Sequence, residues 1–196
     1  QLEQAAVSMQ RYMQYSKLLS ERVPDNADYR LELSFANNNL GSIASAQNKP
    51  EIALGYFIEA ADVNQPLLVK DPNNISFANN AAEIQSWLGT TYLELKQLDK
   101  SKQAYQKGID AVLPFYKVNN GQTAKEQYAR LLSQKAEVVI QSGDVAQGND
   151  LSKQSLGIYQ QLLETDSSNA TWKFMSLLVD HLEQSILTPR LRSLED

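Results

Sequence analysis

His181 is the only histidine of this chain, so it is the only residue that could act in catalysis through an imidazole. The chain contains no cysteine and therefore no thiol nucleophile. A catalytic triad or a two-histidine metal site would therefore have to use His181, with an acid such as Asp180 beside it. The neighbours of His181 at helical spacing are apolar: Phe174, Leu177, Leu178, Leu182 and Ile186. An apolar stripe that includes the imidazole predicts a partly buried structural histidine, and an all-α enzyme that uses His181 is the competing interpretation.

Other catalytic patterns are missing from the sequence. It contains neither a phosphate-binding glycine loop nor a dinucleotide fingerprint nor an HExxH motif. Acidic residues such as Glu32 and Asp144 have no partner at a meaningful spacing. We therefore predict that the chain is not an enzyme by itself and uses no cofactor and no metal.

Composition limits the choice of partners further. The 196 residues are 42% hydrophobic, which is enough for a substantial core, and the net charge of −5 opposes a general role in nucleic-acid binding. No apolar run reaches the roughly 18 residues of a membrane-spanning helix. We predict no nucleic-acid partner and no membrane contact by this segment. The compartment stays open between cytoplasm and periplasm, because a chain without cysteine gives no redox signal.

The elements that must position any site recur at an interval of 48 residues. One gapless shift superimposes five residues on five identical ones: Ala5, Pro24, Asn26, Leu40 and Gly41 on Ala53, Pro72, Asn74, Leu88 and Gly89. A shift of 95 carries Asp71, Asn74 and Phe77 onto Asp166, Asn169 and Trp172. A fixed period of this size is typical of solenoids, in which stacked helical units share one core.

Helical periodicity predicts an all-α protein of about eight helices. The expected ranges are 2–22, 28–47, 50–65, 75–96, 99–113, 122–142, 145–165 and 170–187. Turn and N-cap residues separate the repeats, and short loops make neighbouring helices antiparallel. Pro66 and Pro114 lack a backbone N–H, so we expect each to stop or kink its helix.

The repeated residues resemble the tetratricopeptide repeat family. Counted from Ser34, the family's Leu-Gly, Ala, Phe, Ala and Pro pattern falls on Leu40, Gly41, Ala53, Phe57, Ala60 and Pro66. Counted from Ala82, it falls on Leu88, Gly89, Tyr92, Ser101, Tyr105, Gly108 and Pro114, and a degenerate copy begins at Ala129. The resemblance implies a right-handed superhelix of antiparallel helix pairs. The spacing here is longer than the family's usual 34 residues, and long repeats with Asp-Pro-x-Asn-x-x-aromatic junctions resemble arrays attached to bacterial kinases and other signalling proteins.

The repeat register predicts a single domain over residues 1–196, built from successive repeats. It gives a second helix of a truncated repeat at 1–22, repeats at 28–70 and 75–118, a degenerate repeat at 122–165, a capping helix at 170–187 and a tail at 188–196. The chain opens inside a repeat and without an initiating Met, so we expect a piece of a longer protein.

In the tetratricopeptide family, the second, fifth and ninth positions of each first helix face the ligand in a concave groove. The corresponding residues here are Phe35, Asn38 and Ser42, then Glu83, Ser86 and Thr90, then Arg130, Ser133 and Glu137. The i, i+3, i+7 spacing places each trio on one helical stripe. The resemblance implies hydrogen bonds to a peptide backbone, with Arg130 binding a carboxylate, whereas an ordinary solvated helix face is the alternative.

Two other sets of residues have competing interpretations. The Asn pairs at 38–39 and 79–80 could form a recognition ladder, but a polar helix surface is the interpretation that we favour. Tyr29, Phe77 and Trp172 recur at the repeat junctions and are expected to be core wedges, not a ligand cage.

The sequence thus predicts a protein-binding or peptide-binding module of a bacterial signalling or regulatory protein. A structural spacer or homodimerisation domain without a separate ligand is the alternative. The N-terminal half-repeat carries Met9, Tyr12, Met13 and Tyr15, so a homodimer through this end is a further hypothesis.

Overall fold

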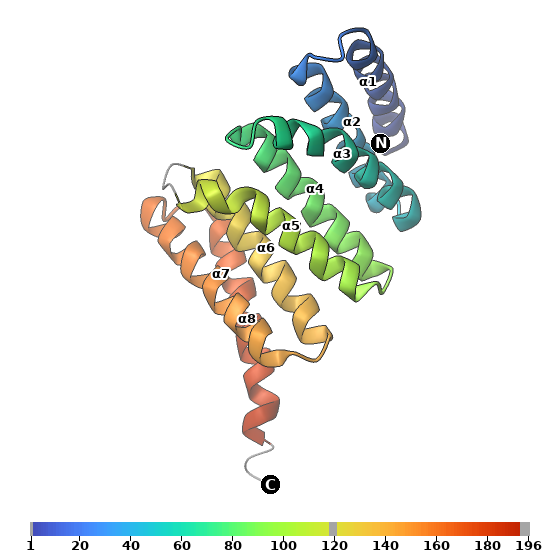
Figure 1. Cartoon of the computed structure of the whole chain (residues 1–196). Coiled ribbons are helices and arrows are strands. Elements are labelled where there is room, and N and C mark those ends of the chain that lie inside the picture. The colour runs from blue at the N-terminus through green and yellow to red at the C-terminus, as the bar shows by residue number, and fades with distance from the viewer. Residues whose placement is uncertain (1, 118–120, 193–196) are drawn as a thin grey trace. The chain divides into compact units, whose positions relative to one another are not determined.

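The computed structural model describes the backbone of residues 2–117 and 121–192, and their side chains except at 117 and 182–192. The described part is helical throughout and contains no strand. Its eight helices are α1 (Leu2–Arg22), α2 (Ala27–Ala46), α3 (Pro50–Lys70), α4 (Ile75–Glu94), α5 (Leu98–Lys117), α6 (Gln122–Gln141), α7 (Val145–Thr165) and α8 (Ala170–Arg192) (Figure 1). The all-α, helix-pair architecture expected from the sequence is confirmed.

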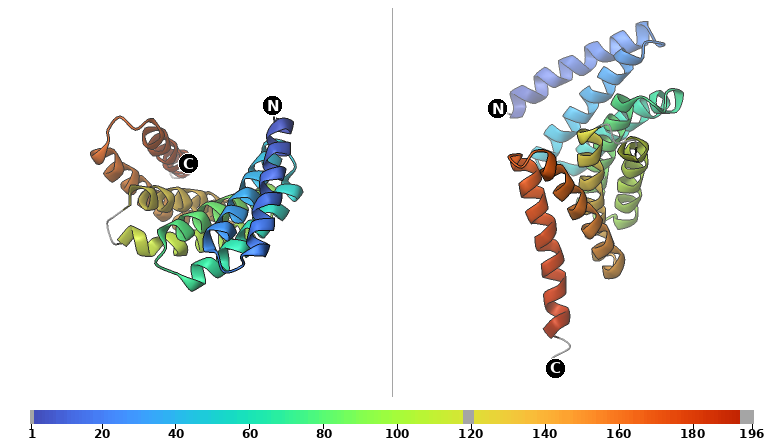
Figure 2. Two further views of the ribbon diagram at one scale, coloured as in Figure 1. Left: turned by 90° about the horizontal axis from the view of Figure 1, so that it is seen from above. Right: turned by 90° about the vertical axis from the view of Figure 1, so that its left-hand side faces the viewer.

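The chain forms two compact units, Gln1–Ala111 and Val112–Asp196, and the boundary between them in the sequence falls within α5. The single domain over 1–196 stays a prediction. We call the first helix of each repeat an A helix (α2, α4, α6 and α8) and the second a B helix (α1, α3, α5 and α7). In both units, helices that are consecutive in the chain pack side by side and antiparallel (Figure 1, Figure 2).

The A and B helices of one repeat interlock where a glycine faces an aromatic ring. A Cβ atom added at Gly41 would lie 2.4 Å from the ring of Phe57, and one added at Gly89 would lie 2.4 Å from the ring of Tyr105. Only glycine allows this approach, because a methyl group would occupy the space of the ring. Gly41 and Gly89, which the repeat register aligns, therefore have the same structural environment.

The degenerate repeat reverses this interlock. Ala136 and Ser152 stand at the positions of the glycine and the aromatic residue. Here the glycine at the close approach is Gly148 of the B helix. A Cβ atom added at Gly148 would lie 2.3 Å from the side chain of Ile140 on the A helix. The helix pair keeps its close approach with the large and small residues exchanged.

The expected helix ends at Pro66 and Pro114 are wrong, because α3 continues to Lys70 and α5 to Lys117. Each proline removes the hydrogen bond to the carbonyl four residues earlier, at Asp62 or Asp110. All four of these residues are exposed. Solvent can therefore take the place of the lost donor, so the helix is not forced to end.

The repeat junctions are capped as the sequence predicts. Asn26 Oδ1 accepts hydrogen bonds from the backbone N–H groups of residues 28 and 29, and Asn74 Oδ1 does the same for residues 76 and 77. Asn169 Oδ1 accepts from the N–H of Trp172. The aromatic residues that follow, Phe77 and Trp172, are buried, which confirms their role as core wedges, while Tyr29 is half-buried.

Candidate binding surfaces

The structure brings two of the three predicted rows together on one face of the first unit. Phe35, Asn38 and Ser42 lie on α2, and Glu83, Ser86 and Thr90 lie on α4. These two A helices contact each other directly. Asn38 Nδ2 donates a hydrogen bond to Glu83 Oε1 at 3.2 Å, so the first and second rows are physically linked.

Two of these six residues are buried, and a third has its hydroxyl bonded within the protein. Asn38 is 3% exposed and Ser86 is 5% exposed. Thr90 Oγ1 donates to the backbone carbonyl of Ser86 at 3.1 Å and lies 3.1 Å from the hydroxyl of Tyr105. The half-buried side chains of Phe35, Ser42, Glu83 and Thr90 are the part of this face that a ligand can reach.

The third predicted row lies in the second unit, on α6. Arg130 is half-buried, and its Nε atom is buried without a hydrogen-bond partner in the protein. Ser133 is buried and donates to the carbonyl of Arg130 at 2.8 Å. Glu137 is exposed and accepts from Gln141 Nε2 at 3.2 Å. A face that all nine residues share stays a prediction.

A buried polar network ties three helices of the first unit together. Asn80 Nδ2 on α4 donates to Ser34 Oγ on α2 and to Asn64 Oδ1 on α3, both at 2.9 Å. Ser34 donates to the carbonyl of Ala60 at 2.9 Å, and Asn64 donates to the carbonyl of Phe77 at 3.0 Å. Buried amides need such partners, so these polar residues fix how the three helices meet.

This network corrects the favoured interpretation of the asparagine pairs. Asn38 and Asn80 are buried, Asn79 is half-buried, and only Asn39 is exposed. A polar helix surface is therefore wrong for Asn38 and Asn80. The physical reason is that a neighbouring helix covers each of them, which a single helical stripe cannot indicate.

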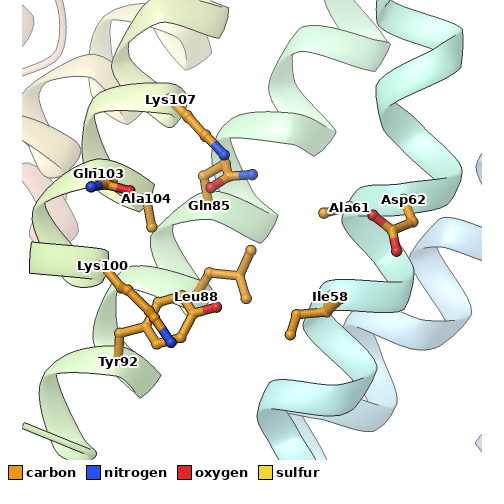
Figure 3. A pocket seen from close by; sticks show the side chains of 10 residues that line it. All are labelled: Ile58, Ala61, Asp62, Gln85, Leu88, Tyr92, Lys100, Gln103, Ala104 and Lys107. Carbon is orange, nitrogen blue, oxygen red and sulfur yellow. The ribbon is translucent and has the colours of Figure 1, made fainter. Parts of the chain in front are cut away.

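The structure also shows a furrow that the sequence reasoning missed. The α3–α5 furrow runs between the B helices α3 and α5 with α4 beneath it, and Figure 3 shows its side chains. Two adjoining cavities of about 320 and 480 Å³ form it. The first is lined by Ile58, Ala61, Asp62, Gln85, Leu88, Tyr92, Lys100, Gln103, Ala104 and Lys107. The side chains are thus mixed, with Gln85, Leu88 and Tyr92 of α4 beneath the furrow and charged residues on both walls.

Both walls of the furrow carry charged side chains. Asp62 lies on the α3 side, while Lys100 and Lys107 lie on α5 (Figure 3). The second cavity is also lined by Asp110 of α5. The ammonium group of Lys100 is 5.5 Å from the ring centroid of Tyr92. The spacing of Lys100 and Lys107, two helical turns apart, was the signal in the sequence that could have indicated a common stripe.

Equivalent furrows recur between other B helices. A cavity of about 230 Å³ lies over α2, lined by Ala6, Gln10, Leu40, Ile43, Ala44, Gln47, Lys49, Ile52 and Tyr56. In the second unit, a cavity of about 340 Å³ is lined by Tyr116, Tyr128, Lys153, Gln154, Gly157, Ile158 and Gln161. The rings of Tyr116 and Tyr128 stack there with centroids 4.5 Å apart. These equivalent furrows therefore carry different side chains in different repeats.

His181 does not have the environment expected from its apolar stripe. Its side chain is exposed, so a partly buried structural histidine is wrong. Among the side chains of α8 that the structure describes, Trp172 and Val179 are the buried ones. His181 lines none of the four cavities, and no group of three His, Cys, Asp or Glu in the described residues could hold a metal ion.

One strongly perturbed titratable group lies in the second unit. The ring of Tyr159 is fully buried between helices, and its hydroxyl has no hydrogen-bond partner in the protein. Burial raises the pKa of Tyr159 well above its ordinary value, Arg130 lowers it and Glu126 raises it. The phenol is therefore neutral at physiological pH and offers no base or nucleophile.

Among the described helices, none combines the length and the apolar character that crossing a bilayer requires.

Comparison with known proteins gives the fold. No protein-family model and no curated protein matches the chain. Among solved structures, BtubC (BKLC) from P. vanneervenii is similar with a TM-score of 0.70 and 16% identity, over 96% of this chain and 66% of that one. The chain thus spans 66% of the length of that protein. The N-terminal domain of stress-induced protein-1 from C. elegans has a TM-score of 0.48 and 18% identity, over 74% of this chain and 96% of that domain. The similarity to BtubC is that of a helical-repeat fold.

Proposed function

We propose that this chain is a protein-interaction module of tetratricopeptide-like repeats that holds a segment of a partner protein. The glycine–aromatic interlocks at Gly41 and Gly89 support the repeat type, because they fall on the family's pattern with the same geometry in both copies. The observation that carries the binding role is the hydrogen bond from Asn38 to Glu83, which fixes polar side chains of two consecutive A helices on one face.

We assign this α2–α4 face as the principal binding surface. The ring of Phe35 would contact an apolar side chain of the segment, and Ser42 and Glu83 would bind its backbone. Asn38 holds the carboxylate of Glu83 in place, so binding loses little side-chain entropy. In the second unit, the proposed binding residues are Arg130, Ser133 and Glu137, and Arg130 would bind a carboxylate of the segment. The Asp71 to Phe77 junction supports a role in a bacterial signalling protein.

The test uses a random peptide library selected against the wild-type chain, followed by titration of the selected peptides. We expect Glu83→Lys to weaken these peptides by at least tenfold, about 1.4 kcal/mol, because it removes the acceptor and reverses the charge. Glu59→Lys makes the same charge change on an exposed part of α3 and should leave binding unchanged. Equal affinities of all three proteins would reject the α2–α4 face.

The α3–α5 furrow is a second candidate surface for the same function, and its cavities of about 320 and 480 Å³ favour it. The apolar side chains of Ile58 and Leu88 and the ammonium groups of Lys100 and Lys107 suit a segment with an apolar and an acidic side chain. Peptides that bind here should be weakened by Lys107→Glu and unaffected by Glu83→Lys. The two variants therefore separate the surfaces in one set of titrations.

A further inference from the structure

The α3–α5 furrow carries charges of opposite sign toward its two ends. Asp62 of α3 and Lys107 of α5 line both of its cavities. The first cavity adds Lys100 and the second adds Asp110, so the first has an excess of positive charge and the second an excess of negative charge. Lys100 and Asp110 are ten residues apart on α5, which corresponds to about 15 Å along a helix. The furrow is therefore a groove with oppositely charged ends.

These four charged residues are exposed and can pair with a ligand. The side chains of Asp62 and Lys107 form no ion pair or hydrogen bond with the described residues, although they line the same cavities. The ammonium group of Lys100 lies over an aromatic ring, 5.5 Å from its centroid. Asp110 Oδ1 accepts from Gln106 Nε2 at 2.7 Å, but the carboxylate keeps its charge and its second oxygen. A ligand with an acidic and a basic group can thus pair with charges that the protein leaves without an ionic partner.

Each of the three helices around the furrow also contributes a glutamine: Gln65 from α3, Gln85 from α4 and Gln103 from α5. None of these side-chain amides forms a hydrogen bond with the described residues. An amide both donates and accepts, as the backbone of an extended segment requires, whereas a helix satisfies most of its own backbone groups. The furrow is therefore better suited to an extended segment than to a helix.

Apolar side chains line both cavities between the charged residues. Ile58 of α3 is 40% exposed and lies beside Leu88 of α4 in the first cavity (Figure 3). Leu68 of α3 and Ala81 of α4 line the second cavity. In an extended segment, side chains two residues apart point to the same side, so two such side chains can enter the two cavities. The volumes of about 320 and 480 Å³ lie within the range of pockets that bind ligands.

We propose that the α3–α5 furrow binds an extended segment of about five residues from a partner protein, with an acidic residue at one end, a basic residue at the other and apolar residues at the second and fourth positions. The inference rests on the proposed interaction function and specifies the chemistry of its second surface. Four steps of an extended chain span about 13 Å, which is close to the separation of Lys100 and Asp110. The acidic residue pairs with Lys100, and the basic residue pairs with Asp110.

Titration of the whole chain with three capped peptides tests the proposal. The Glu/Lys peptide is Glu-Leu-Ser-Leu-Lys, the Lys/Lys peptide has lysine at both ends, and the scrambled peptide is Leu-Glu-Lys-Ser-Leu, with its two charges adjacent. The wild type should bind the Glu/Lys peptide about threefold to tenfold more tightly than either of the others, as expected for exposed ion pairs. Non-specific attraction to a chain of net charge −5 would instead favour the Lys/Lys peptide.

Lys100→Glu should invert this preference, because the acidic end of the Glu/Lys peptide then meets a carboxylate while the Lys/Lys peptide gains an ion pair. Tighter binding of one peptide also shows that the variant is folded. Lys17→Glu is the matched control, since it makes the same charge change at an exposed residue that lines none of the four cavities. It should keep the preference of the wild type.

Equal affinities of the wild type for the three peptides overturn the proposal, and so does a preference that Lys100→Glu leaves unchanged. The outcome for the interaction function is separate. If library-selected peptides bind and are weakened by Glu83→Lys while the Glu/Lys peptide does not bind, the interaction function stands and the assignment of the furrow is rejected. If neither the selected peptides nor the Glu/Lys peptide bind, both are rejected.

Discussion

At the scale of single residues, glycine and serine decide how closely the helices of this protein approach each other. Gly41 and Gly89 allow aromatic rings to pack against a helix backbone. Ser101 adds a hydrogen bond of 2.7 Å to the carbonyl of Gly89, next to the ring of Tyr105. The second repeat is therefore fixed by contacts that tolerate no added atom at Gly89.

Replacing Gly89 with alanine should destabilise the protein by about 1 to 3 kcal/mol, since the new methyl group overlaps the Tyr105 ring. Gly55 is the matched control, because it lies in α3 with no atom within 4 Å of an added Cβ. Gly55→Ala should stabilise by about 0.5 to 1 kcal/mol through helix propensity. Urea denaturation of both variants measures the difference. Equal effects of the two substitutions would contradict the interlock.

Tyr159 makes the stability of the second unit sensitive to alkaline pH. Burial raises the pKa of its phenol in the folded state, so the native protein retains a proton that the unfolded chain releases above about pH 10. The free energy of unfolding should then fall with rising pH, by up to about 1.4 kcal/mol per pH unit from this group. Below pH 10 both states hold the proton, and no dependence arises.

Tyr159→Phe should remove this alkaline loss. At neutral pH it should be neutral or stabilise by about 1 kcal/mol, because the hydroxyl has no hydrogen-bond partner in the protein. The measurement is urea denaturation from pH 8 to pH 11 for both proteins, and the difference isolates Tyr159 from the other tyrosines. Parallel curves would show that the phenol ionises equally in the folded state.

At the scale of helices, α3 and α5 continue past a proline that ordinarily ends a helix. Pro66 is exposed and removes one hydrogen bond, to the carbonyl of Asp62, yet α3 runs four residues further to Lys70. Leu67, in that last turn, is buried. Burial of the final turn therefore offsets the local cost of the proline.

Pro66→Ala should restore the missing hydrogen bond and raise the free energy of unfolding by about 1 to 2 kcal/mol. The helix gains up to about 3 kcal/mol, and the unfolded chain gains about 0.4 to 1 kcal/mol of conformational freedom. Gln65→Ala, at the adjacent exposed residue, should change stability by less than about 0.5 kcal/mol. Thermal denaturation followed by far-ultraviolet circular dichroism measures both. A destabilised Pro66→Ala variant would show that the ring makes contacts that alanine cannot replace.

At the scale of the whole molecule, the two units differ in how well their buried polar atoms are paired. Among the described residues of the first unit, three buried side-chain atoms have no hydrogen-bond partner in the protein, Asn38 Oδ1, Asn79 Oδ1 and Asn80 Oδ1, although Nδ2 of Asn80 donates to two partners within a buried network. Twice as many such atoms lie among the described residues of the second unit: Arg130 Nε, Gln127 Oε1, Asn149 Oδ1, Ser152 Oγ, Tyr159 Oη and Trp172 Nε1. Unpaired buried groups lower stability, so the second unit should unfold first.

The two tryptophans allow this order to be measured, because Trp87 lies in the first unit and Trp172 in the second. Trp172→Phe leaves fluorescence from the first unit alone, and Trp87→Phe leaves it from the second. In each variant the reporting unit keeps its natural sequence. We expect the urea midpoint reported by Trp172 to be lower. Coincident transitions would show that the repeats unfold as one cooperative body.

The sequence by itself determined the number of helices, their order, the repeat register and the caps at Asn26, Asn74 and Asn169. Those features depend on periodicity and on hydrogen bonds between residues close in the chain, which the sequence displays directly. It also placed Asn38 and Glu83 on corresponding stripes of neighbouring A helices.

Only the tertiary structure decided which stripe of each helix is covered. It buried Asn80, exposed His181, carried α3 past Pro66 and opened the α3–α5 furrow. A helix has several candidate faces, and the burial of each is the sum of contacts from helices distant in the chain. Those contacts depend on interaxial distances and on how large and small side chains interlock, and local periodicity contains neither.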